Sequence, residues 1–219
     1  MDKGKGNKTI RLAQFSMILA LEAIVCFTPL GSLPVGPIVA SLSMIPVAVA
    51  GILLGLKAGA LMGFFFGLFS FIVWTFMPPN PLIAFVFTPF YSLGPVQGNF
   101  ASLLICFVPR IAVGVAAALL CKLLLRKPAS GIKDGLKAYF IAGGIASLMN
   151  TFGVLGGIYV FFAGRYAEAL DLSRNLLITV LGGVVLTNGI PEAILCAIFC
   201  AAICGPVKKI VNKTAGQSS

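Results

Sequence analysis

The sequence contains no histidine and few charged residues. Its 219 residues include 16 Lys and Arg and 6 Asp and Glu, so charged residues make up 10% of the chain. Without His, the Ser-His and Cys-His pairs of nucleophilic enzymes and His-ligated metal sites are excluded. A soluble domain carries about 25% charged residues. The hydrophobic content of 59% and the mean hydropathy of +1.05 therefore indicate an integral membrane protein.

Two further patterns are missing. The six cysteines never form the C-x-x-C spacing of zinc or redox sites, so we interpret them as small apolar packing residues. The stretch Gly51 to Lys57 contains two glycines and a lysine, as a phosphate-binding loop does. It lacks the glycine spacing of such a loop and the Ser or Thr that follows the lysine. We expect no metal site, no cofactor and no ATP site in this chain.

The basic residues lie where a membrane protein meets the cytoplasm. The net charge of +10 could suggest nucleic-acid binding, but all Lys and Arg residues except Arg110, Arg165 and Arg174 fall in or beside the two tails and two short loops. Cytoplasmic loops of membrane proteins carry this excess of positive charge. We therefore predict that both ends of the chain face the cytoplasm and that no nucleic acid is bound.

The hydrophobic segments predict an all-α integral membrane protein with six transmembrane helices in one bundle. Each segment is near the ~20 residues that cross a bilayer core. We expect a single transmembrane domain over residues 1–219, in which Met1 to Arg11 form a basic, flexible tail. The expected spans are 12–28, 38–56, 58–77, 101–125, 138–162 and 176–203.

The third span ends at a proline cluster. Pro78, Pro79 and Pro81 cannot continue a helix. The stretch from Pro78 to Phe100 has no charged residue, is apolar and aromatic, and is broken by further Pro and Gly residues. We predict a long outer connector with short helical turns, partly folded over the bundle, rather than a seventh span.

Several polar residues fall at a similar depth inside the predicted spans. Arg110 lies about nine residues into span four, roughly 13 Å from the outer face at 1.5 Å per residue. Asn150 and Thr151 lie near the middle of span five, and Asn188 and Glu192 lie in span six. Polar groups in hydrocarbon face a protein interior or a wet cavity. They predict a substrate-binding pocket that opens to the outside.

Two readings of Arg110 and Glu192 stay open at this point. The pair could form a buried salt bridge that only joins spans four and six, or Arg110 could bind an anionic ligand. Pro109 and Pro191 each directly precede a charged residue, and each leaves a backbone carbonyl without its helical donor. Glu22 either joins the same network or lies near the outer mouth of span one.

The aromatic residues beside the connector also allow two readings. Trp74 and Tyr91 fit an aromatic belt at the membrane interface. Alternatively, they form a lid that stacks over a bound ligand, and we include both as candidate substrate-binding residues. In span one, Ser16, Ala20 and Ala23 leave a flat face of small residues that packs inside the bundle or docks another membrane subunit.

Taken together, these features resemble the substrate-binding S components of energy-coupling factor (ECF) vitamin transporters. The resemblance is carried by five stretches: Leu33–Ala40, Gly63–Phe71, Cys106–Ile111 with Gly114, Ser147–Thr151 and Thr187–Ala193. It implies a subunit of a bacterial cell membrane, without an ATPase site of its own, that captures a vitamin outside. The vitamin passes to a module of one membrane coupling subunit and two ATPases.

The resemblance also implies roles for particular segments. In the family, an Ala-x-x-x-Ala face on the first span docks the coupling subunit, and the matching face here is Ser16-x-x-x-Ala20. The family's connector between spans three and four gates the pocket, which corresponds to Pro78 to Phe100.

Pantothenate is the vitamin that we expect. Its carboxylate suits Arg110, and its amide and hydroxyl groups suit Asn150, Thr151 and Asn188. Riboflavin, folate and cobalamin are the alternative vitamins. The single Trp disfavours the flat rings of riboflavin and folate, although the 18 Phe residues weaken this argument, and cobalamin would need a wider mouth. The alternative function is a stand-alone secondary transporter or channel for a small polar solute, which would use an ion gradient and usually contain an internal repeat.

Overall fold

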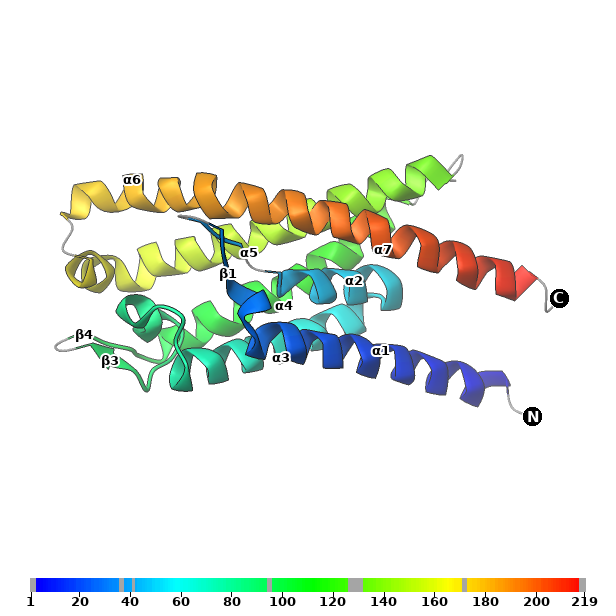
Figure 1. Ribbon diagram of the computed structural model, residues 1–219, viewed down its shortest axis with the longest axis horizontal. Coiled ribbons are helices and arrows are strands. Elements are labelled where there is room, and N and C mark those ends of the chain that lie inside the picture. Colours follow the sequence, from blue (N-terminus) through cyan, green and yellow to red (C-terminus); the bar gives the residue numbers. More distant parts are fainter. Residues whose placement is uncertain are drawn as a thin grey trace.

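Long helices run side by side along one axis of the molecule (Figure 1). The computed structural model describes residues 3–35, 38–40, 42–93, 96–125, 132–170 and 173–216. The helices are α1 (Lys3–Phe27), α2 (Met44–Leu54), α3 (Leu56–Phe76), α4 (Ala101–Leu124), α5 (Ile132–Ala169), α6 (Arg174–Val184) and α7 (Ile190–Gly216). A π-helical turn, η3 (Val185–Gly189), joins α6 to α7, and Figure 1 shows the three as one continuous rod.

Five helical segments of the described chain are long and apolar enough to cross a membrane. They are α1, α3, α4, α5 and the α6–η3–α7 rod, which is apolar over Leu176–Ile210. Several extend beyond the predicted spans, since a helix that has formed across the bilayer adds further residues at little cost. The predicted flexible tail is accordingly helical from Lys3 onward. The chain is a helical, multi-pass membrane protein.

The second predicted span differs from the structure. A helix was expected from residue 38, but α2 begins at Met44 and has only 11 residues, about 16 Å. The preceding segment instead forms a short 3-10 turn, η1 (Pro29–Ser32), and an antiparallel hairpin of β1 (Leu33–Val35) and β2 (Ile38–Ala40). The prolines in this part of the sequence cannot donate helical hydrogen bonds, and this delays the helix. Nearly all of α2 is buried, as expected for a helix that is apolar on every side.

Glycines allow α3 and α4 to approach each other very closely. A Cβ atom added to Gly114 of α4 would clash with the backbone of Gly59 in α3, and one added to Gly63 would clash with the carbonyl oxygen of Arg110. Small residues at a spacing of four permit this kind of contact between membrane helices. The α3–α4 contact places the backbone of Arg110 directly against α3.

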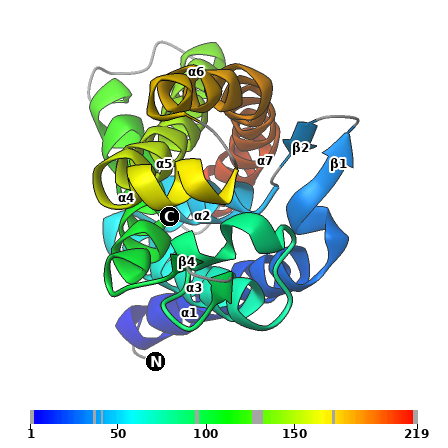
Figure 2. The same ribbon diagram turned by 90° about the vertical axis from the view of Figure 1, so that its left-hand side faces the viewer.

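The connector between α3 and α4 folds over one end of the bundle, as predicted. It contains the 3-10 helix η2 (Pro81–Val86) and a hairpin of β3 (Ser92–Leu93) and β4 (Val96–Gln97). The Asn80 side chain caps η2 by accepting a hydrogen bond from the Leu82 amide at 3.0 Å. Residues Ala84 to Thr88 are buried. Figure 2 looks onto this end, and both chain termini lie at the opposite end in Figure 1.

Several hydrogen bonds fasten the connector to the helices, including one of 3.0 Å that Arg165 of α5 donates to the Gln97 carbonyl of β4. The Thr75 hydroxyl of α3 donates to the Thr88 hydroxyl at 2.8 Å, and the Ser102 hydroxyl of α4 donates to the Phe85 carbonyl at 2.8 Å. The Phe85 ring packs edge-on against Phe162 of α5, with 5.7 Å between ring centres. The connector is thus an ordered cover whose inner surface faces the bundle.

Candidate functional site

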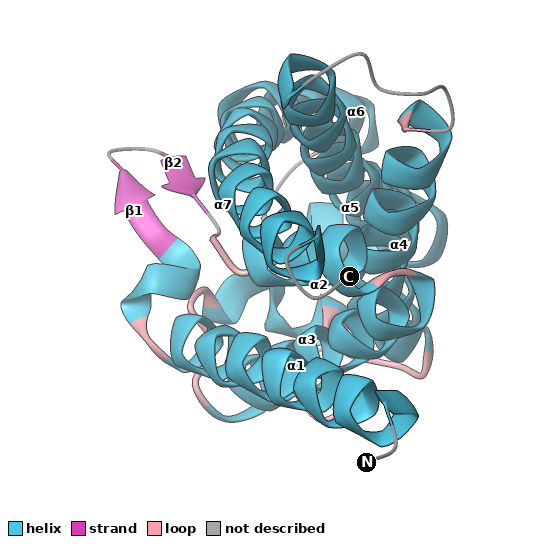
Figure 3. Ribbon diagram, turned by 90° about the vertical axis from the view of Figure 1, so that its right-hand side faces the viewer, coloured by secondary structure: helices cyan, strands magenta, loops and turns pink. Residues whose placement is uncertain are grey.

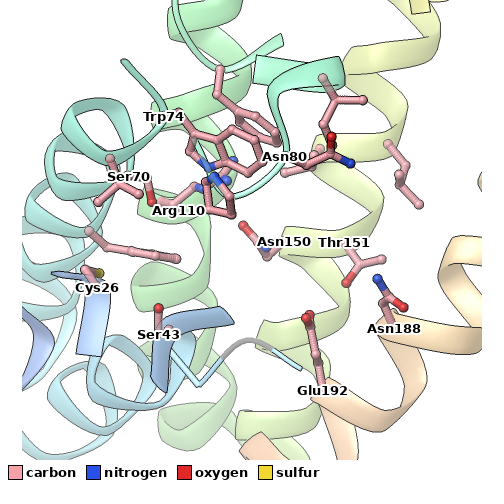
Figure 4. A pocket seen from close by; sticks show the side chains of 18 of the residues that line it. Cys26, Ser43, Ser70, Trp74, Asn80, Arg110, Asn150, Thr151, Asn188 and Glu192 are labelled. Atoms are coloured by element: carbon pink, nitrogen blue, oxygen red, sulfur yellow. The ribbon is translucent and has the colours of Figure 1, made fainter. Parts of the chain in front are cut away.

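A cavity of about 370 Å³ lies inside the bundle beneath the connector. Six of the seven residues that the sequence predicts to bind substrate line it. These are Trp74, Arg110, Asn150, Thr151, Asn188 and Glu192. They come from α3, α4, α5, η3 and α7, and Figure 4 shows their side chains directed toward a common space. Tyr91 lies outside this lining, in the segment just before β3.

Arg110 is held almost completely buried, with 6% of its surface exposed. Its Nη1 atom donates a hydrogen bond of 2.7 Å to the Ile105 carbonyl. That carbonyl is the one that an amide at position 109 would reach in a regular helix, and Pro109, which lies inside α4, has no amide hydrogen to donate to it. The helix around Pro109 therefore supplies both the cation and a backbone acceptor that orients it.

Two aromatic rings complete the surroundings of Arg110. Its guanidinium carbon lies 5.0 Å from the centre of the Phe87 ring and 5.7 Å from that of Phe66. Rings within about 6 Å attract a cation through their negative faces. The buried Nε atom of Arg110 has no hydrogen-bond partner among the described residues. The site therefore holds a buried cation whose Nε–H group is available to donate a hydrogen bond.

The contacts of Arg110 bear on the two readings of this residue. Its hydrogen bond and its ring contacts involve no carboxylate of the described residues. In Figure 4, Arg110 and Glu192 lie on different sides of the pocket, with Asn150 between them in this view. Figure 4 thus places the two side chains on different sides of the pocket, and the contacts of Arg110 among the described residues leave its role open to a ligand.

Helix α5 contributes amide and hydroxyl groups to the cavity. The Oδ1 atom of Asn150 is buried without a hydrogen-bond partner in the described chain, as is the nearby Ser147 hydroxyl oxygen. The Thr151 hydroxyl makes a long hydrogen bond of 3.4 Å to the Ser147 carbonyl. A buried polar atom without a partner costs free energy, so such atoms commonly mark a ligand or water position. Asn150 is the clearest such position on this helix.

The π-helical turn η3 places Asn188 beside α5. Pro191 lacks the amide hydrogen that would reach the Thr187 carbonyl in an α-helix. The chain inserts a wider turn just before it, and the Ile190 amide bonds to the Val185 carbonyl. Gly189 packs against Thr151, where an added Cβ would lie 2.8 Å from the Thr151 methyl carbon. Single π turns in helices frequently occur at functional sites.

The connector and α3 form an aromatic wall. Trp74 stacks on Phe87 with 4.5 Å between ring centres and 27° between ring planes. Both residues line the cavity, together with Asn80 and Ile83 of the connector. Trp74 is therefore part of the pocket wall, and Phe87 joins it to Arg110.

Glu22 lies behind the pocket rather than in it. Its side chain is fully buried, and one carboxyl oxygen accepts a hydrogen bond of 3.2 Å from the Cys26 thiol. Cys26 itself lines the cavity. On another side of the same helix, Ser16 and Ala20 are exposed and Ala23 is half-buried, so the small-residue face is not packed inside the bundle.

Other lining residues were absent from the prediction. Some are small polar residues that occur in many membrane helices, and others are aromatic residues that resemble ordinary core. Only Asn80, an amide within a proline cluster, carried a sequence signal. The lining residues that the sequence did not single out as candidates include Cys26, Ser43, Phe66, Ser70, Asn80 and Phe87.

A membrane-embedded helical bundle around a pocket with several polar side chains is the form of a solute-binding or transport protein. Residues 10–204 match the family model described as "ECF transporter, substrate-specific component". The chain belongs to this family of membrane transport components.

Curated relatives cover almost the whole chain. It is 28% identical over 199 residues to "Pantothenic acid transporter PanT" of Lactococcus lactis subsp. cremoris, an alignment that covers 90% of this chain and 92% of that protein. It is 30% identical over 216 residues to "Pantothenate transporter PanT" of Leuconostoc mesenteroides subsp. mesenteroides, with 96% and 97% covered.

Proposed function

We propose that this chain is the pantothenate-capturing subunit of an ATP-driven vitamin importer in a bacterial cell membrane. The observation that carries the proposal is the buried Arg110 at the wall of a pocket lined by several polar side chains. The names of the two relatives support the choice of vitamin. In this proposal the chain binds its substrate without transforming it, and the pocket faces outward while both termini face the cytoplasm.

Arg110 suits the carboxylate of pantothenate. A guanidinium has five N–H donors in one plane and forms paired hydrogen bonds with a carboxylate. In Arg110, one bond is made to the Ile105 carbonyl, and the Nε atom has no partner in the described chain. We propose that the carboxylate of the vitamin bonds to the Nε side of the guanidinium.

The remainder of pantothenate suits the opposite side of the pocket. It carries an amide, two hydroxyl groups and two methyl groups on one carbon. Asn150, Thr151 and Asn188 offer donors and acceptors for the amide and hydroxyls, and the Glu192 carboxylate accepts from hydroxyls. Val154 and Leu155 supply apolar lining.

The volume of the pocket favours a small vitamin. At about 370 Å³ it lies near the low end of the 300–1,000 Å³ range of ligand cavities. Cobalamin, a large macrocycle, requires a much wider cavity. Riboflavin and folate are flat-ring ligands, whereas Trp74 and Phe87, the stacked pair of the described residues beside this pocket, already stack on each other.

Thermal unfolding of the detergent-purified chain, measured with a panel of vitamins, tests the substrate. A ligand present at 1,000 times its dissociation constant adds roughly 4 kcal/mol of stability. We expect pantothenate to raise the unfolding temperature strongly and riboflavin, folate and cobalamin to leave it unchanged. Stabilisation by another vitamin, or by none, would contradict the proposal.

Reconstituted transport distinguishes the importer from a stand-alone secondary transporter. We propose that the chain works with a membrane coupling subunit and two ATPases, as the family membership implies. Proteoliposomes containing the chain and this module should take up pantothenate only with ATP in the compartment of the ATPases. Uptake by the chain alone, driven by an ion gradient, would favour the secondary transporter.

A further inference from the structure

A second, larger cavity lies at the end of the molecule where the termini are. It is a groove of about 1,000 Å³ whose walls come mainly from α1, α2 and α7. Figure 3 faces this end and shows α1 and α7 on opposite sides, with α2 behind them. The binding pocket described above shares none of its lining residues with this groove.

The walls of the groove are apolar along most of its length. Met17 and Leu21 of α1 lie on one side, and both are largely exposed within the protein. Ile45, Val49 and Leu53 of α2 contribute lining from the second helix. Tyr139 of α5 also contributes.

Positive charges gather at one end of the groove. Arg11, Lys208 and Lys209 all line it. The Arg11 side chain bonds to the Leu54 carbonyl at the end of α2, and the Lys208 ammonium lies 5.3 Å from the centre of the Tyr139 ring. No acidic residue is among the described lining residues, although Asp134 precedes the lining residue Gly135 in the chain. This basic end of the groove therefore favours binding of an anion over binding of a cation.

The dimensions match one leaflet of a bilayer. From Arg11 to Leu21 the α1 helix advances about 15 Å, which is half of a hydrocarbon core about 30 Å thick. Basic pockets between membrane helices at the cytoplasmic side bind anionic lipid headgroups. A lipid placed here has its headgroup at the basic end and its acyl chains along α1 and α2.

We propose that the groove is a binding site for one anionic phospholipid. Its phosphate is held by Arg11, Lys208 and Lys209, and its acyl chains fill the space between α1 and α7. The lipid supplies packing that the protein itself gives sparingly to α1, since only 6% of the most apolar stretch of that helix is buried. The groove lies on a different flank of α1 from Ser16 and Ala20, neither of which lines it.

Native mass spectrometry of the full, delipidated chain tests this site. The chain is titrated with dioleoyl phosphatidylglycerol or with dioleoyl phosphatidylcholine, and the fraction carrying one lipid is measured. We expect the anionic lipid to be retained preferentially. Each basic side chain near an anionic headgroup contributes an attraction equivalent to about a fivefold change in affinity. The double variant Lys208→Gln, Lys209→Gln should therefore weaken phosphatidylglycerol binding by about 25-fold.

Matched controls separate the site from general lipid attraction. Lys57→Gln combined with Lys122→Gln removes the same charge from exposed positions outside the groove and should leave retention unchanged. Met17→Trp fills the groove without a change of charge and should lower retention. Leu12→Trp, at another exposed position on α1, should not.

Three outcomes would overturn the proposal. The first is equal retention of the two lipids, and the second is equal loss in the groove and control variants. The third is unchanged lipid binding in the groove variants together with weaker assembly with the coupling subunit, which would assign the groove to a protein partner. None of these measurements depends on the vitamin, so they do not bear on the proposed substrate.

Discussion

The guanidinium of Arg110 lies 5.0 Å from the centre of the Phe87 ring, so the buried cation of α4 contacts the connector that covers the pocket. Phe87 in turn stacks on Trp74 of α3. A ligand that bonds to Arg110 would therefore bind to a cation that the connector itself contacts. The proposed binding group and the proposed gate are in direct contact.

Arg110→Gln should weaken pantothenate binding by about 100-fold, because hydrogen bonds to a charged partner contribute about 1.5–3 kcal/mol each. Pantothenol, in which a CH₂OH group replaces the carboxylate, should bind the wild-type chain weakly and the variant with nearly unchanged affinity. Titration calorimetry measures the four affinities. Lys122→Gln is the control, since Lys122 is exposed and lies outside the pocket lining. An equal loss for both ligands in Arg110→Gln would show that Arg110 does not bind the carboxylate.

Pro191→Ala should lower pantothenate affinity by about 10-fold. The substitution restores an amide hydrogen that favours α-helical bonding over the π turn, and this rotates Asn188 away from α5. Pro206→Ala, at the other proline inside α7, restores the same group outside the pocket and should leave affinity unchanged. Tight binding by both variants would mean that the π turn does not position Asn188 for the ligand.

Ser16→Leu and Ala20→Leu should spare vitamin binding and stop uptake by the assembled importer. Both residues are exposed on α1 and neither lines the pocket, so larger side chains block only a partner that approaches this face. Binding is measured by thermal stabilisation and uptake in proteoliposomes with the module. Ile24→Leu, at another exposed position on α1, serves as the control. Normal uptake by the Ser16 and Ala20 variants would remove this face from the docking site.

Gly114→Ala should destabilise the fold by about 1–3 kcal/mol, the usual cost of forcing extra atoms into a packed interior. Its Cβ would clash with the Gly59 backbone of α3. Gly156→Ala meets no atom within 4 Å and should be neutral or stabilising by up to about 1 kcal/mol through helix propensity. Thermal unfolding in detergent compares the two variants. Equal unfolding temperatures for the two variants would show that α3 and α4 can move apart without loss of stability.

The strongest part of the site prediction followed from one physical rule. Arg110, Asn150 and Asn188 are too costly in hydrocarbon to face lipid, so their depth in three different helices predicted a shared pocket. The structure places all three in the lining of one cavity. The proline cluster after α3 likewise predicted the ordered connector. That these residues bind the vitamin stays a prediction.

Other features depend on contacts that a single sequence does not reveal. The late start of α2 at Met44 reflects a local choice between a hairpin and a helix in an apolar stretch that suits either. The π turn at Asn188 adds one residue to a helical turn and so changes which side chains face α5. The hydrophobic periodicity of the sequence is too coarse to reveal a single added residue. Ser43 and Ser70 line the pocket, but serines in membrane helices commonly bond only to their own backbone.

The stacked Trp74 has a consequence for spectroscopy. It is the single tryptophan of the whole chain, and it lies in the wall of the pocket against Phe87 of the connector. Indole emission from the unlabelled protein therefore arises at the wall of this pocket alone. The wavelength of its emission maximum and its intensity should depend on whether the connector covers the cavity and whether the cavity is filled. Stopped-flow fluorescence could therefore measure the rates of vitamin binding and release without an attached dye.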